Sequence, residues 1–103
     1  MSEEVTRTAD KFLIKLSPKD SAYIEYRLEG GRMHIDSTFT PDEYRGRGLA
    51  AELTEAAIRY ARENKFKIVP DCSYAEKYFE NHPEHRDVLA STQESKNQSS
   101  KDL

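Results

Sequence analysis

The chain has 103 residues and a mass of 11.9 kDa, the size of one domain, which leaves no room for a second of ordinary length. Sixteen Lys and Arg residues against 19 Asp and Glu residues give a net charge of −3, so the basic surface on which non-specific nucleic-acid binding depends is lacking. No apolar run reaches the roughly 18–20 residues that span a bilayer. The polar N-terminus carries no secretory signal, and the single cysteine cannot form an intrachain disulfide. We therefore expect a cytoplasmic protein without a nucleic-acid or membrane partner.

The C-terminal residues differ in composition from the rest. Residues 91–103, STQESKNQSSKDL, hold a single apolar residue, Leu103. Such a segment buries too little apolar surface to fold. The sequence predicts one folded domain over residues 1–90, followed by a disordered polar tail.

Three stretches of alternating apolar and polar residues open the chain. They predict strands over residues 12–17, 21–29 and 32–39. Gly30-Gly31 is typical of a tight hairpin, because both glycines accept a positive φ. Short turns between consecutive strands favour an antiparallel three-strand meander.

The pattern becomes helical in the second half. Thr40-Pro41-Asp42-Glu43 predicts a capping box at a short helical turn, and the apolar spacing after it predicts a helix over 47–64. The remaining elements are expected to be a strand over 66–70, a helix over 73–81 and a short helical piece over 84–90. The order β-β-β-α-β-α indicates an α+β fold with a mixed sheet, since a helical crossover usually joins parallel strands.

The segment Tyr44-Arg45-Gly46-Arg47-Gly48-Leu49-Ala50-Ala51 lies between a predicted strand and a predicted helix. The first N–H groups of a helix have no intrahelical partner, and the helix dipole is positive there. Two glycines allow close approach to the backbone, and two arginines add positive charge. The segment therefore predicts a phosphate or pyrophosphate site; the alternative is a turn that only begins the helix.

Two other glycine loops are compared with this one. The P-loop pattern GxxxxGK[ST] is absent. Gly46-x-Gly48-x-x-Ala51 matches the dinucleotide pattern GxGxxG/A, with Asp71 about twenty residues later. That pattern belongs to the first strand of a parallel sheet, whereas three antiparallel strands come first here. A nucleotide-binding module is the weakest of the alternatives.

Arg45-x-x-Gly48-x-Ala50 resembles the pyrophosphate loop of the GNAT N-acetyltransferase superfamily, Q/R-x-x-G-x-G/A. A second motif, P-x-C-x-[FY]-x-x-x-[FY], runs from Pro70 to Tyr78. Together they resemble the small single-domain, acetyl-CoA-binding branch of that superfamily over residues 12 to about 90. The resemblance implies a GNAT-like mixed sheet and an acetyltransferase that uses acetyl-CoA.

The resemblance also implies roles for individual residues. Backbone N–H groups of the loop would hold the CoA pyrophosphate, and the end of the third strand would pair with the pantetheine arm in a slot opened by the splayed fourth strand. Cys72 would lie near the thioester, with Tyr74 and Tyr78 beyond it. The residues expected to contact the cofactor are Thr38, Phe39, Thr40, Tyr44, Arg45, Gly46, Arg47, Gly48, Leu49, Ala50, Cys72, Tyr74 and Tyr78.

The roles of several individual residues have more than one interpretation. Cys72, the candidate catalytic residue, is read as a nucleophile, as a bystander beside the cofactor or as a structural residue. Tyr78 is read as a proton donor to the CoA thiolate or as a packing residue. The branch usually reads I-D-H-T where this chain reads Ile35-Asp36-Ser37-Thr38, so Ser37 replaces a histidine. His82 and His85 lack the further ligands of a metal site, and no metal is expected.

Two functions follow from these observations. The first is an acetyl-CoA-dependent N-acetyltransferase whose acceptor is a primary amine, on a small molecule or on a protein lysine. The second is a CoA- or acyl-CoA-binding module without turnover, which the replacement of the histidine by Ser37 favours. The sequence does not identify the acceptor or the oligomeric state.

Overall fold

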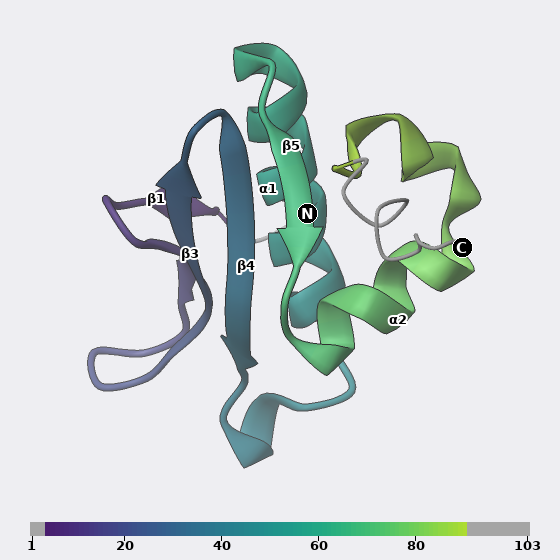
Figure 1. Ribbon diagram of the computed structural model, residues 1–103. Coiled ribbons are helices and arrows are strands. Elements are labelled where there is room, and N and C mark those ends of the chain that lie inside the picture. Colours follow the sequence, from purple (N-terminus) through teal and green to yellow (C-terminus); the bar gives the residue numbers. More distant parts are fainter. Residues whose placement is uncertain (1–3, 91–103) are drawn as a thin grey trace.

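The computed structural model describes residues 4–90, so the predicted polar tail lies outside the described residues (Figure 1). Five strands form one sheet in the order β1-β2-β3-β4-β5. Their bounds are β1 Thr6–Arg7, β2 Lys11–Lys15, β3 Ser21–Glu29, β4 Arg32–Phe39 and β5 Lys67–Pro70. The helices are α1 Leu49–Asn64 and α2 Ser73–Asn81, with 3-10 helices η1 Asp42–Tyr44 and η2 Pro83–Val88. The predicted α+β class and the predicted order of the main elements are confirmed.

The antiparallel meander consists of β2, β3 and β4. Gly30 and Gly31 make the hairpin turn at φ values of 54° and 81°, in the left-handed region where a side chain is unfavourable. The hairpin therefore has the geometry that its glycine pair predicts.

One strand was not predicted. β1 pairs with β2 through two residues only, which is too short for any alternation to be visible in the sequence. A side chain holds this segment from inside the sheet: the Tyr26 hydroxyl donates to the Thr8 carbonyl at 2.7 Å and accepts from Arg7 Nη1 at 3.1 Å.

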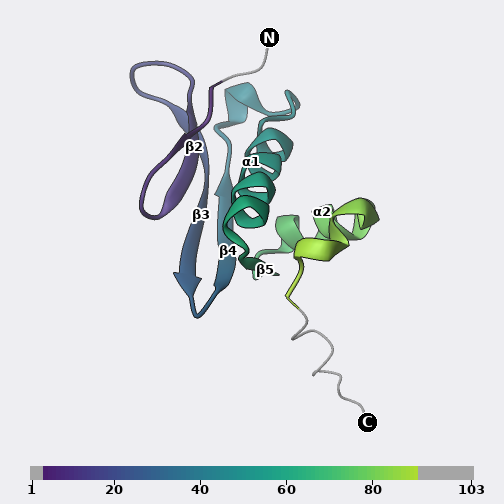
Figure 2. The ribbon, with the colours of Figure 1, turned by 90° about the horizontal axis from the view of Figure 1, so that it is seen from above.

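The helix α1 connects β4 to β5, which pair in parallel. Figures 1 and 2 show α1 running along one face of the sheet, with α2 beyond the β5 side. Three alanines of α1 allow the close approach, since Ala57 and Ala61 are fully buried and Ala56 packs at the margin of the core. The buried sheet residues facing this helix are Phe12, Ile14, Ala22, Ile24, Tyr26, Met33, Ile35 and Ile68.

The opposite side of the sheet, which we call the open face, carries no helix in the described part of the chain (Figure 2). Its side chains on β3 and β4 are mostly polar and half-buried or exposed: Tyr23, Glu25, Arg27, Glu29, Arg32, His34, Asp36, Ser37 and Phe39.

The predicted capping box is wrong, although the short helical turn is present as η1. Pro41 is the N-cap residue of η1, and no side chain caps it. Thr40 therefore lies one residue too early to serve as the cap, because a capping side chain must belong to the N-cap residue itself.

Candidate functional site

The site begins where β5 leaves β4. The parallel pairing ends at Ile35 and Pro70, and the Ile35 carbonyl then accepts the N–H groups of Asp71 and Cys72 at 3.0 and 3.1 Å. Beyond this point, residues 36–39 of β4 have no β5 partner. All four residues of β5 pair with β4, so the expected splay of the strand is not seen within β5 itself. Instead β5 ends here and one edge of β4 is left free; we call this place the fork.

A β-bulge lies at the same fork. Tyr26 pairs with Ile35 but Glu25 pairs with Ser37, so Asp36 is an extra residue on β4. Because of the bulge, two consecutive side chains lie on the open face. Asp36 accepts from Arg27 Nε at 3.0 Å, and Ser37 Oγ donates to Glu25 Oε1 at 2.7 Å.

A pocket of about 430 Å³ adjoins the free edge of β4. It is formed by the end of β4, the loop that precedes α1, the first turn of α1 and one residue of α2. The residues that line it are Thr38, Phe39, Thr40, Tyr44, Arg45, Gly46, Gly48, Leu49, Ala50, Ala51 and Tyr74. Its size lies within the range of small-molecule sites, which is about 300–1,000 Å³.

The first turn of α1 contributes unpaired backbone donors to this pocket. Gly48 is the N-cap residue at φ 78°, and no side chain caps the helix. The first helical bond joins the Glu52 N–H to the Gly48 carbonyl at 3.0 Å, so the N–H groups before Glu52 have no intrahelical acceptor. A Cβ atom built at Gly46 or Gly48 would meet nothing within 4 Å, so the space beside this backbone is open.

The two arginines of the loop differ in position. Arg45 lines the pocket, with Nε donating to the Thr40 carbonyl at 3.2 Å and Nη2 lying 3.3 Å from Asp42. Arg47 is not among the lining residues, and its guanidinium lies 5.0 Å from the centre of the Tyr44 ring. No Asp or Glu is among the residues that line the pocket, and Arg45 is the one charged side chain among them.

Similarity to known proteins identifies the family of this chain. Residues 11–88 match the family described as GCN5-related N-acetyl-transferase. The chain belongs to this family. The match spans β2 to β5, α1 and α2, which include the elements that form the fork and the pocket.

Relatives of this GCN5-related N-acetyltransferase, and the solved structure of a similar protein, give the same result. The chain is 34% identical over 82 residues to protein NATD1 from Gallus gallus and from Homo sapiens, covering 78% of this chain and 74% and 73% of theirs. A solution structure from Staphylococcus aureus, described as GCN5-like, matches with a TM-score of 0.72 and 33% identity. That match covers 87% of this chain and 91% of the other.

Cys72 of this GCN5-related N-acetyltransferase caps a helix. It is the N-cap residue of α2, and its Sγ accepts the Ala75 N–H at 3.4 Å. It is half-buried, packs against the core and is not among the residues that line the pocket. Tyr74, two residues later, lines the pocket, and burial together with the neighbouring Cys72 raises the pKa of its hydroxyl.

Tyr78 is directed elsewhere. It is buried, and its hydroxyl donates a short hydrogen bond to Glu55 of α1, which also accepts from His85 Nε2 at 2.9 Å. Burial and the Glu55 bond raise the pKa of Tyr78, which disfavours the phenolate. Burial alone would raise the pKa of Glu55, but the hydrogen bonds from Tyr78 and His85 outweigh it and lower that pKa. The packing interpretation of Tyr78 agrees with these contacts better than proton donation does.

The pocket therefore brings together most of the predicted site residues and leaves out Arg47, Cys72 and Tyr78. Ala51, the last residue of the predicted phosphate-binding segment, also lines the pocket, although it was not among the residues expected to contact the cofactor. Sequence reasoning missed Glu55, which is half-buried on α1 and carried no distinguishing signal in the sequence. Within residues 4–90 no group of three or more His, Cys, Asp or Glu side chains could hold a metal ion. None of the described helices is long and apolar enough to span a membrane.

Proposed function

We propose that this chain transfers an acetyl group from acetyl-CoA to a primary amine, on a small molecule or on a lysine side chain. The observation that carries the proposal is the continuity of two unpaired backbone surfaces. The N–H groups at the start of α1 and the free edge of β4 border one pocket. A general acetyltransferase role follows from membership of the family, whereas the donor and the acceptor are proposed here.

The residues present fit coenzyme A. A pyrophosphate requires N–H donors and positive charge, and the start of α1 with Arg45 provides both. The open space beside Gly46 and Gly48 lets an anion reach this backbone. An arm containing amide groups requires a strand edge with unpaired donors and acceptors, and residues 38–40 supply it beside the pocket.

The proposed roles follow these surfaces. Backbone N–H groups from Arg45 to Ala50 hold the pyrophosphate, and the backbone of Thr38 to Thr40 pairs with the pantetheine arm. Tyr74 closes the pocket on the α2 side. When bound, acetyl-CoA supplies an acetyl group activated as a thioester, and the protein contributes mainly by holding it and orienting the amine.

For Cys72 the three interpretations predict different outcomes. Its Sγ accepts a backbone N–H at the start of α2, an arrangement that serves a structural cap as well as a stabilised thiolate. Replacement of Cys72 by Ala separates them: a nucleophile predicts loss of turnover and of any acetyl adduct. Full turnover in Cys72→Ala would eliminate the nucleophile and leave the cap or the bystander.

The test is thermal unfolding with acetyl-CoA, CoA, NAD and ATP in parallel. A ligand at about 100 times its Kd adds about 2.7 kcal/mol to stability, which is about ten degrees for a small domain. We expect CoA and acetyl-CoA to raise the midpoint and NAD and ATP to leave it unchanged. No shift with CoA or acetyl-CoA would refute the proposal, and a shift with NAD alone would favour a nucleotide-binding module.

Turnover is measured next, as release of free CoA thiol in the presence of an amine panel. Binding of acetyl-CoA without release with any amine would favour the second function, a CoA- or acyl-CoA-binding module. Acetylated amine detected by mass spectrometry, in proportion to the thiol released, is the result we expect.

A further inference from the structure

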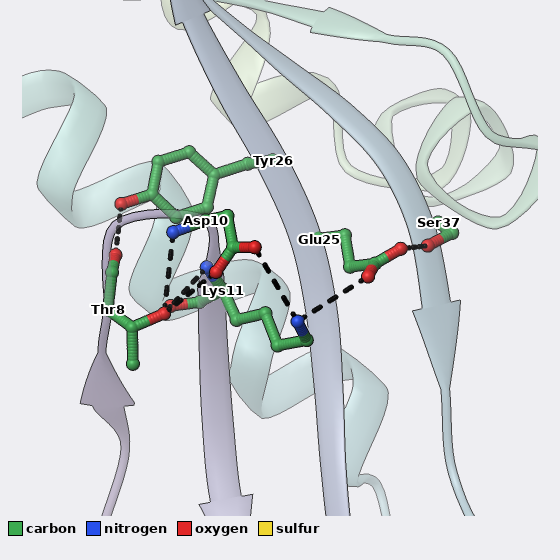
Figure 3. Close-up of polar contacts among 6 residues, drawn as sticks. All are labelled: Thr8, Asp10, Lys11, Glu25, Tyr26 and Ser37. Carbon is green, nitrogen blue, oxygen red and sulfur yellow. Dashed lines mark hydrogen bonds and ion pairs between the residues drawn. The ribbon is translucent and has the colours of Figure 1, made fainter.

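The structure places a hydrogen-bonded serine–glutamate pair at the fork between β4 and β5. Ser37 Oγ donates to Glu25 Oε1 at 2.7 Å, from β4 to β3 across the open face (Figure 3). The pair exists only because of the bulge at Asp36, which turns Ser37 to the open face opposite Glu25. We infer that Ser37 and Glu25 form the proton-accepting pair for the acceptor amine, an inference that rests on the proposed function.

The direction of approach supports this role. The pocket proposed for the cofactor is bordered by the first turn of α1 and by Tyr74 of α2, so a bound cofactor would fill that side and the acceptor would approach from the other. The open face has no helix over it in the described residues, and the fork opens onto it. Ser37 directly precedes Thr38, the first β4 residue that lines the pocket, and its side chain lies on the open face. An amine that enters from the open face therefore meets Ser37.

The other charged groups around the fork are already engaged with one another. Asp36 of β4 and Asp71, which follows β5, lie 3.0 and 3.5 Å from Arg27, and Asp71 also lies 2.8 Å from His34 Nδ1. His34 faces Glu29 at 3.6 Å as well. These contacts leave the pair of Ser37 and Glu25 as the group at the fork that has hydrogen-bonding capacity towards an incoming amine.

Glu25 is held in place from the other side. Lys11 of β2 lies 3.6 Å from Glu25 Oε2 and 3.6 Å from Asp10, so one glutamate oxygen faces a cation while Oε1 faces the serine (Figure 3). Glu25 is half-exposed, which lets a transferred proton pass on to water. Lys11 thus positions the carboxylate without occupying the oxygen that bonds Ser37.

The proton balance is simple. The amine nitrogen forms a bond to the acyl carbon, the carbon–sulfur bond breaks, and its electron pair leaves on the CoA sulfur as thiolate. The nitrogen must then lose one proton. Ser37 Oγ takes that proton while its own hydroxyl proton moves to Glu25 Oε1, so the serine is unchanged and the glutamate becomes neutral. Proton transfer of this kind contributes about 10²–10⁴-fold to a rate.

The test uses acetyl-CoA with n-butylamine and Nα-acetyl-lysine amide as probe amines. We expect Glu25→Gln, which keeps the size and a hydrogen bond to Ser37, to lower kcat by about 100-fold or more. The KM of the amine and the stabilisation by CoA should be unchanged. Ser37→Ala should lower kcat equally, and the double variant should fall no further, because the two residues act as a unit. Glu29→Gln is the matched control on the same strand and face, and should retain wild-type kcat.

A rescue excludes a merely structural effect. Because an imidazole accepts a proton without help, Ser37→His should restore transfer in the Glu25→Gln background. Failure of this rescue, or wild-type kcat in Glu25→Gln, would overturn the inference. If acetyl-CoA does not stabilise the wild-type protein, the proposed function itself fails. Stabilisation together with normal turnover in Glu25→Gln would instead overturn the pair alone.

A second readout does not depend on turnover. In the CoA complex, the carboxyl carbon signal of Glu25 in ¹³C NMR should shift when n-butylamine is added, because the amine bonds Ser37. The shift should be absent in Ser37→Ala. If the Glu25 signal of the wild-type protein does not respond to the amine, the inference is overturned. This holds even if the protein binds CoA but acetylates neither probe amine.

Discussion

At the scale of single residues, Gly48 has two roles that experiments can separate. It adopts φ 78° as the N-cap residue of α1, and it lines the pocket. Gly31, in the β3–β4 hairpin, adopts a similar φ of 81° but lies outside the pocket. Neither glycine has an atom within 4 Å of a built Cβ, so replacement by Ala costs backbone strain and no steric clash.

We predict that Gly48→Ala and Gly31→Ala each lower the free energy of unfolding by about 1–2 kcal/mol, the cost of a left-handed alanine. Only Gly48→Ala should also reduce the stabilisation by CoA, because its methyl group enters the space beside the α1 N–H groups. Urea unfolding with and without CoA measures both effects. Equal CoA stabilisation in the two variants would contradict the location of the anion site.

The Glu55 carboxylate links α1 to Tyr78 and His85, and this link depends on pH. Because folding lowers the pKa of Glu55, its stabilising contribution is present above the pKa of the unfolded chain, near 4.5, and is lost as the pH falls through the lower folded value. We predict that the stability difference between wild type and Glu55→Gln shrinks from about pH 6 to about pH 3.

Chemical unfolding at each pH measures this difference. Tyr78→Phe removes one of the hydrogen bonds that lower the Glu55 pKa, so the wild-type pH dependence in this range should be weaker in that variant. A difference between wild type and Glu55→Gln that is constant across the range would show that the carboxylate contributes nothing through its charge.

At the scale of elements, β1 is held in place by one side chain of β3, which lies two strands away in the sheet. The Tyr26 hydroxyl donates to the Thr8 carbonyl and accepts from Arg7, while its ring lies in the core. We predict that Tyr26→Phe costs about 0.5–1.5 kcal/mol, the net value of such a bond. It should also increase hydrogen exchange of β1 amides more than that of β4 amides.

Tyr23→Phe is the control, since Tyr23 lies on the same strand but on the open face. Its amide exchange in β1 should match wild type. If Tyr26→Phe leaves β1 exchange unchanged, the backbone pairs of Thr6 and Arg7 hold that segment by themselves.

The elements that the sequence predicted are those with a clear period. The long alternation over β3 and β4 and the helical spacing over α1 are both read directly from apolar positions. The bulge is different. The hairpin at Gly30-Gly31 would place Glu25 opposite Asp36, and only the extra residue shifts its partner to Ser37. No spacing rule reveals one inserted residue, so Glu25 was interpreted as part of a solvated strand face.

The part of the candidate site that is formed by backbone groups could be predicted from the sequence. The loop from Tyr44 to Ala50 was identified from its glycines and arginines, and most of it lines the pocket. Side-chain direction was not predictable in the same way. Tyr74 and Tyr78 share a spacing of four, yet one lines the pocket and the other bonds Glu55, because the spacing does not specify how α2 packs on the rest of the fold.

At the scale of the whole molecule, the last residues that the structure describes, 88–90, pack against the rest of the fold. The Ala90 N–H donates to the Ile68 carbonyl at 2.9 Å, and Val88 and Ala90 are buried. We predict that a chain ending at residue 90 unfolds at the same midpoint as the full chain, whereas one ending at residue 87 is less stable. Thermal unfolding of the two shortened chains and the full chain tests this. A midpoint for the chain ending at residue 90 that is lower than that of the full chain would show that residues 91–103 contribute to stability.

The two outer strands of the sheet also bear on self-association. On one side β1 is two residues long, with the Arg7 guanidinium folded 4.3 Å from the Tyr60 ring centre. On the other side Leu89 forms a bridge to Ile68 of β5. Short or covered edges of this kind discourage the edge-to-edge growth that leads to aggregates. In the described part of the chain, the strand backbone most open to an extended guest therefore lies along residues 36–39 of β4, and the last two of these residues border the pocket.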